Sequence, residues 1–283
     1  RRRESGGAGL KRTSLRARLL SAPYIVWAAI FIVVPLFIVV YYAFTDRSGV
    51  FSLSNITALA DYKDTFIISV WYSVIATVIT LVIAYPFAYA LSRFGANTQR
   101  MMMLLVMLPM WMNLLIRTYS WMNILERNGI INNVLAGFGI EPLKMIGTPG
   151  AVILGMVYNY LPYMILPIYT VMSKLDITLL EAADDLGANA FQRLRTLVIP
   201  LSMPGVISGI TMVFVPSVST FYISQKLGGG KIMLIGDAIE RQIQQQYNYN
   251  LGASISLVLM VMILISMAIM NRFASDDAER LVV

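Results

Sequence analysis

Six long apolar stretches determine what this chain can fold into, because none of them contains an Asp or a Glu. They cover residues 22–44, 65–92, 101–123, 150–173, 197–223 and 251–270. The hydrocarbon core of a bilayer is about 30 Å thick and needs about 20 apolar residues of helix, so each stretch is long enough to cross it. A buried helix of a soluble protein would carry a polar stripe, and these stretches carry none. The sequence therefore predicts an all-α, polytopic membrane protein with six transmembrane helices.

The composition and the charge of the chain exclude several classes of protein. Hydrophobic residues make up 58% and charged residues 13% of the chain, whereas soluble domains are about 45–50% apolar and about 25% charged. Cys and His are absent, which excludes Cys or His nucleophiles and zinc sites built from these residues. We therefore expect no enzyme, no metal and no cofactor. The net charge of +7 fits the basic cytoplasmic segments of a membrane protein better than a nucleic-acid partner.

The distribution of Lys and Arg predicts the orientation of the helices. If the N-terminus is cytoplasmic, the inside segments hold twice as many Lys and Arg as the outside loops, in keeping with the positive-inside rule. We therefore expect both termini in the cytoplasm. The predicted domains are a basic cytoplasmic N-terminal segment at 1–21, a transmembrane domain at 22–272 and a cytoplasmic tail at 273–283. Within the first segment, residues 10–20 form either a helix in the headgroup layer or a solvated basic tail.

Prolines and aromatic residues within the apolar stretches indicate a path through the bundle. Most of the 11 prolines lie in the stretches, and each removes a backbone hydrogen bond that the protein or water must replace. Polar and aromatic side chains gather in the third and fourth stretches: Trp111, Asn113, Arg117, Tyr119, Trp121, Tyr158, Asn159, Tyr160 and Tyr163. They line a cation route, since aromatic faces attract ammonium groups, or they form the aromatic belt at the membrane interface. The candidates for the substrate path are Trp111, Asn113, Tyr119, Tyr158, Asn159 and Tyr160.

The loop at 174–196, between the fourth and fifth stretches, carries the most specific local pattern. Thr178 and Glu181 have the spacing of a capping box and predict the start of a short helix. Gly187 stands where a left-handed residue would end that helix, and Asn189 can cap a second short helix after it. Small residues permit close approach to the groove of a partner, so we expect a docking surface here. Its face is formed by Ala182, Ala183 and Leu186.

This loop resembles the EAA motif of ABC-transporter permeases of the binding-protein-dependent import type. Glu181-Ala182-Ala183 is followed after three residues by Gly187 and after nine more by Leu-Val-Ile-Pro at 197–200. The family pattern ends in Ile-x-Leu-Pro, so Leu and Ile are exchanged here. Other segments are similar to the permeases of spermidine/putrescine importers, namely 161–169, 173–176, 199–205 and 227–236, and the resemblance extends over 23–272.

The resemblance implies a permease subunit in a bacterial inner membrane, with ATP hydrolysed by another polypeptide. A cytoplasmic coupling helix would sit in a groove of an ABC ATPase dimer. The residues of this helix would be Glu181, Ala182, Ala183, Leu186 and Gly187. A second permease subunit and an extracytoplasmic solute-binding protein would complete an importer for polyamines such as spermidine or putrescine. Closure of the ATPases on ATP would then alternate access through the bundle.

Asp237 and Glu240 mark a departure from the related permeases, which usually carry Asn-Leu-Ile after the glycine at 236. These two acids steer a polycation that the solute-binding protein delivers, or they are ordinary solvated charges of a loop. Closely related permeases take iron, thiamine or other solutes, so these substrates are alternatives. A stand-alone secondary carrier or channel is a further alternative, although the stretches hold no acid for a proton relay and such a carrier has no use for the loop at 174–196.

Overall fold

The computed structural model describes residues 23–280, and it describes side chains up to residue 272. The predicted basic segment at 1–21, with its stretch at 10–20, and the last residues, 281–283, lie outside the described residues. Within 23–280 the chain is helical, and the one strand-like feature there is an isolated bridge between Thr45 and Phe51. This agrees with the predicted all-α class.

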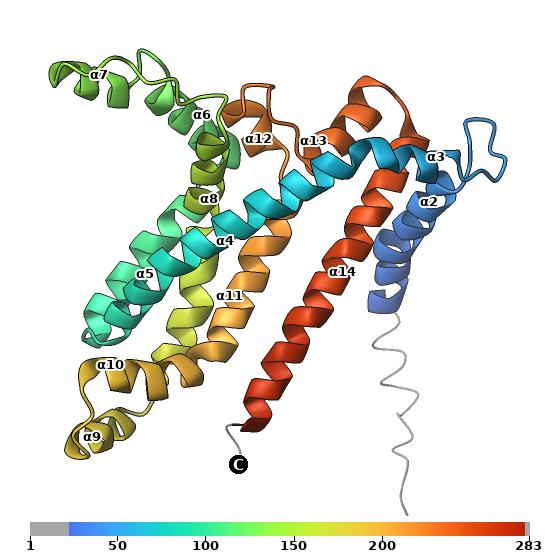
Figure 1. Cartoon of the computed structure of the whole chain (residues 1–283). Helices are drawn as coiled ribbons and strands as arrows, with labels where there is room; N and C mark the ends of the chain where they lie inside the picture. Colours follow the sequence, from blue (N-terminus) through green and yellow to red (C-terminus); the bar gives the residue numbers. More distant parts are fainter. Residues whose placement is uncertain (1–22, 281–283) are drawn as a thin grey trace, which may run out of the picture.

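Five helical segments are long and apolar enough to cross a membrane, and they match five of the six predicted stretches. They run over Pro23–Ala43, Ser54–Ser92, Pro149–Met172, Ala190–Ser219 and Tyr249–Arg272. Their main helices in Figure 1 are α2 (Val34–Ala43), α4 (Lys63–Ser92), α8 (Pro149–Met172), α11 (Ile199–Ser219) and α14 (Tyr249–Arg280). Because α14 stays helical to Arg280, the tail predicted to begin at 273 starts as part of the last helix.

The third predicted stretch is not one straight helix. α5 (Ala96–Trp111) is followed by α6 (Leu114–Leu125) and α7 (Ile130–Gly137), and the chain bends by 91° at the break after α5. Asn113 starts the new helix, since its side chain accepts the Leu115 N–H at 2.7 Å. The prediction of one continuous helix at 101–123 is wrong in this respect, because apolar composition carries no information on direction. Counted as one broken span, the pair brings the number of spans to six.

Prolines explain two wide turns in the spans. The π-helical segments η1 (Ala29–Val33) and η3 (Leu194–Val198) come directly before the turns that contain Pro35 and Pro200. Proline lacks the N–H that would bond to the preceding turn, and its ring crowds the carbonyl there. A wider turn relieves this crowding, so the backbone of these membrane helices is locally loosened where the sequence places proline.

The short helices lie at two opposite ends of the bundle (Figure 1). One end carries α9 (Ile177–Asp185) and α10 (Ala190–Arg193). The other end carries α6 and α7 together with α12 (Tyr222–Leu227) and α13 (Ile235–Glu240), which is followed by η4 (Arg241–Gln245). Between the two ends, large apolar side chains stay exposed along the spans, among them Phe37, Ile67 and Trp71. Such a surface suits contact with lipid.

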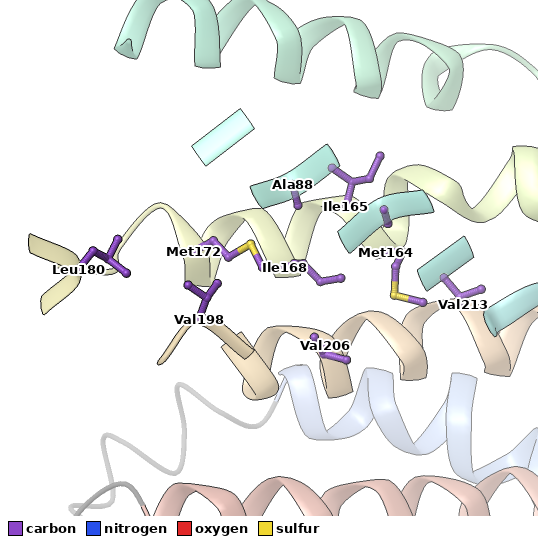
Figure 2. Close-up of a cluster of buried hydrophobic side chains, with 10 residues drawn as sticks. Ala88, Met164, Ile165, Ile168, Met172, Leu180, Val198, Val206 and Val213 are labelled. Carbon is purple, nitrogen blue, oxygen red and sulfur yellow. The ribbon is translucent and has the colours of Figure 1, made fainter. Parts of the chain in front are cut away.

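The centre of the bundle is the packing of α4, α8 and α11 against one another (Figure 1). Figure 2 shows a buried cluster to which α4 contributes Ala88, α8 contributes Met164 and α11 contributes Val206. Gly205 permits close approach of α11 to α8, because a Cβ atom at this position would lie 2.8 Å from the carbonyl oxygen of Pro167. Small residues at helix contacts are typical of membrane bundles.

A row of hydroxyl side chains runs along the buried face of α4. Each hydroxyl donates to the carbonyl oxygen four residues earlier in the same helix, at 2.6 or 2.7 Å, and the row consists of Ser69, Ser73, Thr77 and Thr80. Ser69 also accepts the N–H of Ile235 at 2.8 Å, which fixes the start of α13 against α4. The row therefore satisfies its own polar groups inside the helix, as an apolar surrounding requires.

Candidate functional site

The loop predicted to dock a partner is built on α9 (Ile177–Asp185), whose N-cap lies two residues before the predicted one at Thr178. The N-cap is Asp176, whose side chain accepts the Thr178 N–H at 3.0 Å. The predicted capping box of Thr178 and Glu181 is therefore wrong. Asp is among the strongest N-cap residues, so its position just ahead of Thr178 takes over the start of the helix.

The end of α9 confirms the predicted turn. Gly187 has φ +80°, and the N–H of Ala188 donates to the carbonyl oxygen of Ala183 at 3.0 Å. This is the geometry of a helix ended by a left-handed glycine. Asn189 caps α10 as predicted, in a reciprocal capping box with Gln192. Two consecutive caps hold α9 and α10 as a compact turn between two spans.

The loop is attached to the core of the bundle by the buried side chain of Leu180, and the partly buried Leu175 and Leu194 pack against the same cluster. Leu180 of α9 is buried in the same cluster as Met172 of α8 and Val198 of η3 (Figure 2). Within the loop, an ion pair joins the two short helices, since Arg193 of α10 donates to Asp184 of α9 at 2.6 Å. Through Leu180, α9 therefore belongs to the same buried cluster as α8 and α11.

The outer face of the loop is exposed and partly apolar. Of the residues predicted to couple to an ATPase, Glu181, Ala182, Leu186 and Gly187 are exposed, and Ala183 is half-buried. Leu186 is 89% exposed, and Phe191 on α10 is 70% exposed. Exposed large apolar side chains at the end of a bundle form the kind of surface that protein partners cover.

The residues proposed for a substrate path form separate contacts. Trp111 is 76% exposed at the end of α5, and Asn113 serves as the N-cap of α6. On α8, the ring of Tyr158 lies 5.2 Å from Trp121, whereas the hydroxyl of Tyr160 donates to the backbone of Pro216 at 3.3 Å. Asn159 is buried and donates to the carbonyl oxygen of Gly155 at 2.8 Å. These contacts do not join the residues into one aromatic channel within the described part of the chain.

Tyr119 belongs to a group that the sequence patterns missed. Its ring lies 6.4 Å from that of Tyr222 on α12, and the ammonium of Lys226 lies 5.2 Å from the first ring and 5.7 Å from the second. An ammonium beside two tyrosine rings is stabilised by cation–π attraction. The spacing of Tyr222 and Lys226, one helical turn apart, is the signal that could have pointed to this contact.

Asp237 and Glu240 lie on α13, at the end of the bundle opposite α9 (Figure 1). Asp237 is only 7% exposed, and its Oδ2 accepts the N–H of Leu234 at 2.8 Å. Burial raises the pKa of Asp237 to about 6, and the neighbouring Glu240 carboxylate adds to the rise, while the Ser224 side chain and the hydrogen bond from Leu234 oppose it. The alternative that both acids are ordinary solvated charges is therefore wrong for Asp237.

The amides around Glu240 were also missed. Its Oε2 accepts from Nε2 of Gln225 at 3.0 Å and from Nε2 of Gln245 at 3.4 Å. Gln225 lies on α12 and Gln245 in η4, so three separate segments meet here. Sequence spacing cannot bring such residues together, because their meeting depends on the fold.

Similarity to known proteins completes the description of these sites. Residues 6–275 match the family described as "Binding-protein-dependent transport system inner membrane component". The chain belongs to this family. A binding-protein-dependent permease is a multi-pass inner membrane protein and a transport subunit rather than an enzyme.

Named relatives of this permease cover most of its length. The spermidine/putrescine transport system permease protein PotB of Haemophilus influenzae is 37% identical over 228 residues, 76% of this chain and 79% of the relative. PotB of Escherichia coli is 35% identical over 226 residues, 76% of this chain and 82% of the relative. A bacterial ABC transporter that imports the polysaccharide alginate has the same fold, with a TM-score of 0.75 and 16% identity over 92% of this chain and 96% of that one.

Membership of the family confirms the predicted class of ABC importer permease. Such permeases work with an ATPase and a solute-binding protein, and the alginate transporter has also been solved in complex with a periplasmic protein. The stand-alone carrier or channel is not favoured by these findings.

Proposed function

We propose that this permease imports spermidine or putrescine as one membrane subunit of an ATP-driven importer. The observation that carries the proposal is the similarity to permeases named for these polyamines, which are 34–37% identical over 76–82% of the chain. Iron and thiamine, the alternative substrates, have no comparable support in the relatives described above.

The coupling step is assigned to α9. The exposed face with Glu181, Ala182, Leu186 and Gly187 docks into the groove of a cytoplasmic ATPase, together with the half-buried Ala183. ATP is hydrolysed by that separate subunit. The buried contact of Leu180 supports this role, because it links the docked helix to α8 and α11. Closure of the ATPase pair changes the relative energy of two arrangements of the bundle, and access alternates between them.

The orientation follows from the same assignment. With α9 in the cytoplasm, both termini are cytoplasmic, in keeping with the excess of Lys and Arg on that side. The opposite end, with α12 and α13, then faces the outside and receives solute from a binding protein of the spermidine/putrescine type. A second, homologous permease of that type lies beside this one.

The test is uptake of labelled spermidine by cells that lack every other polyamine importer. The complete transporter is expressed from this permease, its partner permease, its ATPase and its binding protein. We expect saturable uptake that is inhibited by putrescine and abolished when the ATPase carries an inactivated nucleotide site. Absence of spermidine and putrescine uptake from cells with normal amounts of the assembled complex would contradict the proposal.

A further inference from the structure

A cavity of about 220 Å³ lies among α12, α13 and η4. Its lining includes Gln225, Asp237, Glu240 and Gln245, and the side chain of Arg241 also contributes to it. Asp237 and Glu240 are three residues apart on α13, so their carboxylates lie on one face of the helix. Gln245 and Arg241 are exposed, which means that the cavity opens at the surface of the molecule. We call it the α13 cavity.

The buried Asp237 carboxylate has only half of its hydrogen bonding satisfied. Oδ2 accepts the Leu234 N–H and so caps the first turn of α13. Oδ1 is buried and has no hydrogen-bond partner among the described residues. Buried polar atoms are almost always paired, and an unpaired carboxylate oxygen is among the most costly to bury. The capping role therefore accounts for one oxygen and leaves the other unexplained.

The second carboxylate of the cavity is held in place by neutral groups. The amides of Gln225 and Gln245 donate to Glu240 from two sides. Among the side chains that the structure describes, no Lys or Arg lies within 4.0 Å of the carboxylate of Asp237 or Glu240. Arg241 contributes to the wall without pairing with either acid. The cavity thus presents two acids, neither of which is paired with Arg241 or with another described cation.

We propose that the α13 cavity binds a primary ammonium group of the transported solute, with Asp237 and Glu240 as its acceptors. An ammonium carries three N–H donors and no acceptor, which matches the unpaired oxygen of Asp237 and the oriented carboxylate of Glu240.

The size of the cavity defines how much of a solute it takes. Sites that enclose a whole drug-sized ligand are about 300–1,000 Å³, and the α13 cavity is smaller. It accepts one amine end and a few methylenes, while the rest of a polyamine extends beyond it. This assignment of substrate rests on the proposed import of polyamines and places the first amine contact at the outer end of the bundle.

The first test measures the concentration dependence of spermidine uptake by the complete transporter with Asp237→Asn or Glu240→Gln in the permease. Loss of a charged hydrogen bond corresponds to about a tenfold change in affinity or more, so we expect KM to rise by about that factor while the maximal rate changes little. Glu141→Gln is the matched control, because Glu141 is an exposed acid in the loop after α7, outside the cavity. Unchanged KM in both variants, or an equal rise in the control, would overturn the proposal.

The second test does not depend on transport. The purified complete transporter is heated with and without spermidine, and the midpoint of unfolding is compared between the wild type and Asp237→Asn. A site at the α13 cavity requires spermidine to stabilise the wild type more than the variant. If cells fail to import polyamines but this difference is present, the proposed function fails and the site stands. If uptake occurs and the difference is absent, the site fails and the proposed function stands.

Discussion

Asp237 combines deep burial with a charge that no described cation neutralises, and this sets a pH dependence for the protein. Its folded pKa of about 6 is above the ordinary value of 3.8, so the folded state holds the proton more tightly than the unfolded state. The penalty is absent below about pH 4 and grows as the pH rises through about 6. Asp237 therefore lowers the free energy of unfolding at neutral pH.

Replacement of Asp237 by Asn should raise stability in a pH-dependent way. Asn keeps an oxygen that can accept the Leu234 N–H and removes the buried charge. We expect a gain of up to about 3 kcal/mol near pH 8 that falls to about half near pH 5 and toward zero below about pH 4. The measurement is the unfolding midpoint of the purified transporter across this range. A gain of the same size at every pH would exclude the charge as its cause.

Gly187 provides a second prediction for a single residue. A Cβ atom here would meet nothing within 4 Å, so the obstacle to substitution is the backbone, with φ +80°. Gly187→Val forces a β-branched residue into the left-handed region, which costs about 1–2 kcal/mol. We expect this variant to insert into the membrane normally but to lose ATP-dependent uptake.

Two variants control for this effect. Asn tolerates the left-handed conformation, so Gly187→Asn should retain most of the uptake. Gly139 has φ +74° and open space around it as well, so Gly139→Val imposes the same strain away from α9 and should leave uptake unchanged. Normal uptake by Gly187→Val would contradict a docking role for this turn.

At the scale of the element, α9 combines an exposed face, which we propose docks the ATPase, with a buried side chain in the core of the bundle. Leu186 and Leu180 represent these two faces, since the first is exposed and the second belongs to the central cluster (Figure 2). The two leucines allow docking and transmission to be separated by experiment.

Leu186→Ala and Leu180→Ala should therefore fail in different ways. Loss of the exposed leucine removes apolar contact area, and we expect weaker capture of the ATPase on the purified permease pair. Loss of the buried leucine creates a cavity worth about 2–5 kcal/mol; the ATPase should still bind, while more ATP is hydrolysed for each spermidine imported. The same ratio of ATP to spermidine in Leu180→Ala and wild type would refute transmission through this contact.

The elements that could be predicted from the sequence are those that form because of residues close to one another in the chain. Long runs without acids identified the spans, and Gly187 and Asn189 identified turns that depend only on neighbouring residues. The break after Trp111 escaped prediction because hydropathy continues across it, although Asn113 is a recognisable N-cap. The meeting of Gln225 with Glu240 was beyond reach, because it requires α12 and α13 to be placed in space.

At the scale of the whole molecule, α9 lies at one end of the bundle and α13 at the other (Figure 1), so the proposed docking face and the proposed amine site are at opposite ends. The six apolar stretches of the sequence contain no Asp or Glu. They therefore offer no acidic side chain for a proton relay. Permeases of this family work with an ATPase, and this is the source of energy that we propose.

Removal of the ATPase should consequently stop all transport. In cells that express this permease with its partner permease and binding protein but without the ATPase, we expect no spermidine uptake above background. Restoration of the ATPase on a plasmid serves as the control. Residual, saturable uptake without any ATPase would support a stand-alone carrier instead.

The hydroxyl row of α4 has a consequence for how this bundle moves. Ser73, Thr77 and Thr80 bond to carbonyl groups of their own helix, so neighbouring helices can slide past that face without breaking a polar bond. Ser69 is different, since it also holds Ile235 of α13. The middle of α4, from Ser73 to Thr80, therefore carries no side-chain hydrogen bond to another helix among the described residues. Ser69 ties α4 to α13 on one side of this part, and on the other side the hydroxyl of Tyr85 lies 2.9 Å from that of Ser202 on α11. Relative motion of the helices that keeps every polar contact is thus confined to the middle of α4.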